Sequence, residues 1–229
     1  MPPSYVVGSS YQINWLTVAE RDHLDSQPWV FCVNDFLQHH SRAGFRPSVW
    51  IYGDNHNLEN VDALAAQLAV IRRDSRLTDR PRLRFAALEN CADEARRVVE
   101  VSGLKVRFYR RGPPWLAGQP PARSLDEQIF HYGSTLTNAV NMAWILNPGE
   151  EIRVLSNPYG PKFAHFWHRD SDVPSPTETG DTIWPHVMEC MWQGLSDLHH
   201  KWGLPIVDCN AEHEVPLQCQ PLPRGTVLG

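Results

Sequence analysis

Ser4-Tyr5-Val6-Val7-Gly8-Ser9-Ser10 begins with a β-branched run that predicts a short strand, and the strand leads directly into a turn of small residues. A helix-like segment follows from about Asn14. Proteins of the α/β class build phosphate-binding turns in this way, because glycine admits a ligand to the backbone and the amides of a helix start favour negative charge. The turn has neither a complete Gly-x-Gly-x-x-Gly motif nor a Walker lysine, so its meaning depends on the strands that follow.

Further short apolar runs continue the strand pattern along the chain. Most are uninterrupted by polar residues, which is typical of strands covered on both faces. They lie at residues 29–33, 49–52, 83–88, 106–109, 152–155 and 205–207. Helical patterns separate them, so the sequence predicts an α/β fold: a Rossmann-like, mainly parallel sheet with helices on both faces.

Three helical regions are predicted between these strands. Residues 61–71 have apolar side chains at helical spacing. The pattern Ser124-Leu-Asp-Glu127 resembles a capping box and predicts a second region that extends to Leu146. The third covers residues 182–202, where Pro185 is tolerable in the first turn.

We expect one nucleotide-binding domain over residues 1–215, followed by a C-terminal tail over residues 216–229. An insertion at about 160–182 is polar and flanked by aromatic residues. It is interpreted either as a lid over a site or as a plain surface connection.

Composition limits the classes of function. The 229 residues are 42% hydrophobic and carry a formal net charge of −5, which does not favour a nucleic-acid binder. A basic group at Arg107, Arg110 and Arg111 is either ordinary surface or an anion site. The five cysteines have no Cys-x-x-Cys spacing, and the chain has no leader-like start and no apolar run of membrane-spanning length. The expectation is a cytoplasmic protein without a transmembrane segment, with a homo-oligomer left open.

Polar and small residues follow several of the predicted strands. In a parallel sheet these strand ends share one edge, where ligands bind. A single Asn or Asp there is often only a turn former, but the repetition favours a pocket for ribose, base edges and phosphate. The predicted binding residues are Gly8, Ser9, Ser10, Asn34, Asp54, Ser156 and Asn157.

The segment from His131 to Asn138 interrupts the second helical region with Gly-Ser-Thr. One interpretation is a new helix that begins at Ser134 and Thr135 and directs its first amides and hydroxyls at an anion. The other is a kinked helix with ordinary polar neighbours.

His165 and His168 are the candidate catalytic histidines. Their spacing would allow metal binding, but no second ligand pair lies at a fitting interval. A general base for an acceptor hydroxyl is the preferred role for one of them, and a structural role is the alternative.

The order of these motifs resembles the small bacterial sialyltransferases of glycosyltransferase family 42. It is also similar to a related family that includes archaeal-type 6-hydroxymethylpterin diphosphokinases. The matching residues are the Gly8 turn, Cys32-Val-Asn34-Asp35, Trp50-Ile-Tyr-Gly-Asp54, Ser134-Thr135 and Ser156-Asn157. The chain departs from the family pattern at Tyr11, in place of a Gly-Pro turn, and at Asn157-Pro158-Tyr159.

The resemblance implies a nucleotide-activated sugar donor, of the CMP-linked kind, and inverting transfer to an acceptor hydroxyl. It implies no obligatory metal, His168 or His165 as the base, and Tyr159 as the partner of the departing phosphate. One alternative is a Mg²⁺-dependent diphosphokinase acting on a pterin-like hydroxymethyl group, with Asp54 and either Asp35 or Asp170 as ligands. Another is a nucleotide-binding protein without catalysis.

Overall fold

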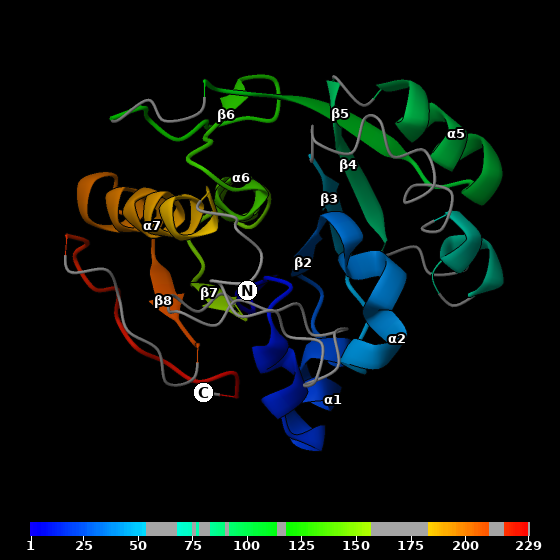
Figure 1. Cartoon of the computed structure of the whole chain (residues 1–229), viewed down its shortest axis with the longest axis horizontal. Helices are drawn as coiled ribbons and strands as arrows, with labels where there is room; N and C mark the ends of the chain where they lie inside the picture. The colour runs from blue at the N-terminus through cyan, green and yellow to red at the C-terminus, as the bar shows by residue number, and fades with distance from the viewer. Residues whose placement is uncertain are drawn as a thin grey trace.

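The centre of the protein is a sheet of eight strands within the part of the chain that the structure describes, and every neighbouring pair is parallel. The computed structural model describes residues 1–53, 68–74, 77, 83–89, 92–113, 118–156, 183–210 and 218–228. The strand order across the sheet is β6-β5-β4-β3-β2-β1-β7-β8. The predicted α/β, Rossmann-like fold is therefore confirmed (Figure 1).

All of the strands except β6 coincide closely with the apolar runs of the sequence. They are β1 (Ser4–Val7), β2 (Val30–Val33), β3 (Val49–Tyr52), β4 (Arg84–Leu88), β5 (Val106–Arg111), β6 (Gln128–Ile129), β7 (Ile152–Leu155) and β8 (Ile206–Asp208). In β1, β2 and β3 every residue is buried. An uninterrupted apolar run is stable in this position because both faces of the sheet are covered.

Successive residues of the central strands pack into two different cores. Val6 belongs to the core that contains α6 and α7 residues, whereas Tyr5 and Val7 belong to the core that contains Leu24 of α1. Since side chains alternate across a strand, the two helical layers lie on opposite faces of the sheet. Figure 1 shows α6 and α7 on one side of the strands and α1 and α2 on the other.

The helices vary from single turns to four turns. Those whose bounds the structure describes are η1 (Tyr11–Trp15), α1 (Val18–Ser26), η2 (Asn34–His39), α2 (His40–Ala43), α5 (Ala92–Ser102), α6 (Thr135–Leu146), α7 (Ile183–Ser196) and the π-helical turn η6 (Asp197–Lys201). Residues 68–73 are helical as well. Helix α1 begins with a complete capping box between Thr17 and Glu20. Helix α6 is buried along most of its length and packs against β1, β2, β3 and β7.

The chain reverses its direction of progress across the sheet at β1. From β1 it builds outward to β6, and it then returns through α6 to place β7 on the other side of β1. A reversal of this kind leaves a crevice beyond the carboxyl ends of the two strands, where α/β proteins bind ligands.

The predicted helical region from Ser124 to Leu146 is wrong in its first part. Residues 124–127 form a turn, in which Ser124 Oγ accepts from Asp126 N and Glu127 Oε2 accepts from Arg123 N. The polar side chains that suggested a helix cap therefore satisfy a local turn instead. Strand β6 follows, and α6 begins at Thr135, as the new-helix interpretation predicted.

The described part of the tail packs against the sheet rather than extending from it. Asp208 of β8 forms a bridge with Arg224, and Val227 is buried. Tyr5 Oη donates to the carbonyl of Val227. The predicted lid at about 160–182 and residues 61–67 of the predicted first helix lie outside the described residues, whereas residues 68–71 of that helix are helical. The predicted helix at 182–202 is confirmed by α7 and η6.

Candidate functional site

Asn34 links three elements at the carboxyl edge of the sheet. It follows β2 with a φ of 45°, a conformation that asparagine tolerates better than most residues. Its side-chain Oδ1 accepts from Gly53 N at 3.1 Å, and its Nδ2 lies 3.5 Å from Thr135 Oγ1. Its carbonyl accepts from Trp50 Nε1. The Asn34 amide therefore shapes the edge and holds the start of α6 over β2 and β3.

Gly53 follows β3 in a position that only glycine can fill. A Cβ atom there would overlap the hydroxyl of Tyr109 and lie 3.3 Å from Thr135 Cγ2. The Gly53 carbonyl accepts from the guanidinium of Arg111 at 3.0 Å. This contact places the guanidinium of Arg111, the last residue of β5, at the same edge and close to the start of α6.

Polar residues of α6 position the segment that precedes the helix. Ser134 caps it, since its hydroxyl accepts from Leu136 N. Asn138 Nδ2 donates to the carbonyl of Phe130, and Asn141 Oδ1 accepts from the backbone N–H of Phe130 and of Ala122. These buried bonds hold the strand end of β6 against the first turns of α6.

His131 lies at that strand end and is 6% exposed. Burial and, to a smaller extent, the positive charge of Arg111 lower the pKa of its imidazole to about 4, while Asn138 and the backbone of Ser134 oppose the shift. Its Nδ1 atom makes no hydrogen bond. At neutral pH the site therefore holds an uncharged imidazole beside a guanidinium.

Ser10 and Ser156 join β1 and β7 at the switch point. Their hydroxyls lie 3.1 Å apart, Ser156 Oγ donates to the Ser10 carbonyl, and Ser10 N donates to the Ser156 carbonyl. Ser156 has a φ of 57°, so the chain turns out of β7 through a left-handed residue, as it does at Asn34 after β2. These serines tie the two strands together.

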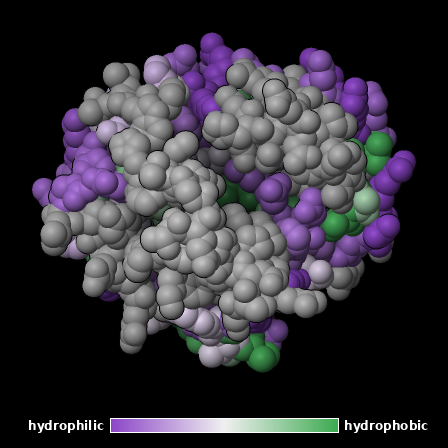
Figure 2. Space-filling view, in the orientation of Figure 1, coloured by the Kyte–Doolittle hydropathy of each residue, from purple (hydrophilic) through white to green (hydrophobic). Residues whose placement is uncertain are grey.

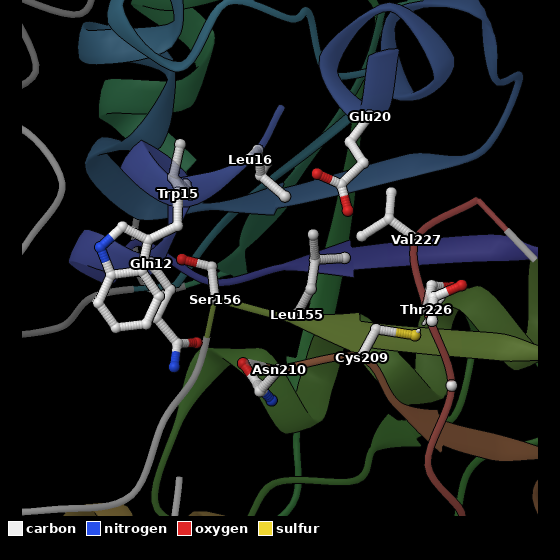
Figure 3. A pocket seen from close by; sticks show the side chains of 12 residues that line it. Gln12, Trp15, Leu16, Glu20, Leu155, Ser156, Cys209, Asn210, Thr226 and Val227 are labelled. Carbon is white, nitrogen blue, oxygen red and sulfur yellow. Dashed lines mark hydrogen bonds between the residues drawn. The ribbon is translucent and has the colours of Figure 1, made fainter. Parts of the chain in front are cut away.

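A pocket of about 220 Å³ opens beside this serine pair (Figure 3). Its walls come from η1 and α1, from the ends of β7 and β8, and from the tail. The lining residues are Gln12, Ile13, Trp15, Leu16, Glu20, Leu155, Ser156, Cys209, Asn210, Gly225, Thr226 and Val227. Burial raises the pKa of the Cys209 thiol to about 12, so this sulfur is protonated at neutral pH and is no nucleophile.

The structure places the predicted site residues in two groups on one edge. Gly8, Ser9 and Ser10 adjoin Ser156, with Gly8 N donating to the Leu155 carbonyl. Asn34, Ser134 and Thr135 gather at the start of α6. Five other predicted residues lie outside the described part of the chain, and they are Asp54, Asn157, Tyr159, His165 and His168.

Sequence reasoning did not single out His131 or Gln12 as site residues. The available signal for His131 was its place just before Gly-Ser-Thr, and for Gln12 its place in the turn after the first strand. Neither belongs to a motif. Arg111 belongs to the basic group for which the sequence leaves ordinary surface and an anion site as alternatives.

Within the described ranges, no three His, Cys, Asp or Glu side chains are grouped closely enough to hold a metal. The described helices include none with the length and hydropathy needed to cross a bilayer. On the face drawn in Figure 2, the described hydrophobic residues form small separate groups among hydrophilic ones. On this face the described residues thus show no broad apolar patch, and the carboxyl edge of the sheet is the candidate site.

Neither the models of known protein families, the curated proteins nor the solved structures give a match to this chain.

Proposed function

We propose that the protein is a transferase that uses a nucleotide-activated sugar, with the donor bound across the carboxyl edge of the sheet. The observation that carries this proposal is the gathering of Asn34, Arg111 and the α6 start at that edge. An Arg guanidinium and a helix N-terminus both attract phosphate. The resemblance of the strand-end motifs to glycosyltransferase family 42 suggests a CMP-linked sugar as the donor.

In the proposed reaction, the acceptor oxygen attacks the anomeric carbon of the sugar. The bond between that carbon and the phosphate oxygen breaks, and its electron pair leaves with CMP. The acceptor proton passes to a histidine base, for which His168 or His165 is proposed, with Tyr159 donating to the departing phosphate. Attack from the face opposite the leaving group inverts the anomeric centre. Arg111 stabilises the charge that develops on the phosphate.

A nucleotide-binding panel tests this proposal. The melting temperature is measured with CMP, UDP, GDP and ATP, each with and without Mg²⁺. Stabilisation by CMP without metal is the expected result. A response to ATP that requires Mg²⁺ would favour the diphosphokinase alternative, and no response to any nucleotide would contradict donor binding.

Arg111→Met locates the phosphate in the same experiment. Loss of a charged hydrogen-bond donor is expected to weaken CMP binding on the order of tenfold or more. Arg123 is exposed and lies between β5 and β6. Arg123→Met is therefore the matched control, and it should bind CMP as the wild type does. Release of CMP from a CMP-sugar in the presence of acceptor then separates a transferase from a protein that only binds the nucleotide.

A further inference from the structure

The pocket beside the switch point contains a buried side-chain amide without partners. Gln12 is 5% exposed, and neither its Oε1 nor its Nε2 makes a hydrogen bond. Burying an unpaired amide opposes folding, and native proteins keep few such groups. A ligand that pairs with the amide when it binds would explain why a glutamine occupies this position.

Unlike Gln12, the neighbouring polar side chains that line the pocket make hydrogen bonds within the protein. Asn210 also lines the pocket, but its Nδ2 donates to Asp208 Oδ1 at 2.8 Å. Ser156 donates its hydroxyl proton to Ser10. Both groups are thus engaged by the fold, whereas the Gln12 amide, buried behind the same wall, makes no hydrogen bond. Figure 3 shows the Gln12 side chain extending from η1 beside Trp15, toward the region of Asn210.

The chemistry of the amide specifies a class of ligand. A glutamine side chain presents an acceptor and a donor next to each other, so it complements a ring edge that carries an adjacent donor and acceptor. Nucleobases have such an edge. The pocket volume of about 220 Å³ is below the usual range for drug-sized ligands, roughly 300–1,000 Å³, which favours a single ring over a fused one. Trp15, which is 54% exposed, adds an aromatic surface at the wall.

We propose that this pocket binds the pyrimidine ring of a nucleotide and that Gln12 recognises the hydrogen-bonding edge of the ring. The assignment rests on the proposed function, since the ring would be the base of the donor nucleotide. The pocket and the Asn34 group belong to the same sheet edge, on either side of β1. From the pocket, the rest of the nucleotide would extend across the switch point toward the turn after β1.

The test is calorimetric titration of cytidine, CMP and ribose 5-phosphate into the wild type and into Gln12→Met, which keeps the side-chain volume. Cytidine and CMP affinities are expected to fall on the order of tenfold or more, because two hydrogen bonds to the ring are lost. Ribose 5-phosphate should bind both proteins equally. Gln12→Leu provides a second variant, and Gln220→Met, at an exposed site, should behave as the wild type.

A second readout needs no ligand. Because the amide is unpaired in the free protein, Gln12→Met should melt at the same temperature as the wild type or higher. The proposal is overturned if neither cytidine nor CMP binds the wild type, or if both bind Gln12→Met as tightly. If cytidine binding depends on Gln12 but CMP binds no better than cytidine and ribose 5-phosphate does not bind, the ring site stands and the donor-phosphate site fails.

Discussion

The pKa of the buried His131 side chain reflects its surroundings at the candidate site. Its imidazole is uncharged in the folded protein at neutral pH because burial and Arg111 disfavour the cation. The unfolded chain has no such restriction, so the two states bind different numbers of protons between the two pKa values. The ring therefore links folding stability to pH at the carboxyl edge of the sheet.

The sign of that linkage follows from the two pKa values of His131. The folded pKa of about 4 lies below the unfolded value of about 6.5, so stability is complete above pH 6.5 and falls as the pH decreases toward 4. The full loss from this residue is about 3 kcal/mol. His131→Gln should remove that part of the pH dependence in urea unfolding between pH 4.5 and 7.5. His200→Gln, at an exposed position, should retain it, and an unchanged slope in His131→Gln would contradict the burial argument.

Helix α6 organises the site because its buried amides bond to the segment before it. Asn141 is fully buried, accepts from Ala122 N and Phe130 N, and donates to the Ala122 carbonyl at 2.9 Å. It thus joins the chain on both sides of β6 to the helix. The amide of Gln12 is also buried, but it makes none of these bonds. Two residues with the same functional group should therefore respond to substitution in opposite directions.

Asn141→Leu tests this contrast. Two buried N–H groups and one carbonyl lose their partner, which should cost about 3 kcal/mol or more in the free energy of unfolding at pH 7. Gln12→Met, measured in parallel, should cost nothing. A loss of less than about 1 kcal/mol in Asn141→Leu would show that the β6 segment does not depend on the helix.

The elements that could be predicted from sequence are those with a strong local pattern. β1, β2 and β3 are uninterrupted apolar runs, and the structure places them within one residue of the predicted bounds. β6 has only Gln128 and Ile129, and it depends on pairing with Arg110 and Arg111 of β5, which no local pattern reveals. The same is true of the turn at residues 124–127, where the residue types suit a helix cap and a turn equally well.

At the scale of the whole molecule, the sheet topology explains which parts of the site were predictable. Because the carboxyl ends of parallel strands share one edge, the sequence alone predicts that Ser10, Asn34 and Ser156 lie at that edge. It could not place Arg111, Gln12 or His131, because their positions depend on the exit of β5, the path of η1 and the packing of β6 on α6. Those depend on contacts between residues far apart in the chain.

We propose that a nucleotide binds across the carboxyl edge of the sheet, on both sides of β1. Hydrogen–deuterium exchange with and without CMP tests it most directly, because it locates the ligand on the chain without requiring turnover. We predict slower exchange in peptides covering residues 8–13, 34–36 and 131–137, with no change in α5 or at residues 148–152 of the opposite edge. Unchanged exchange in the first three regions at saturating CMP, or protection confined to the opposite edge, would contradict the claim.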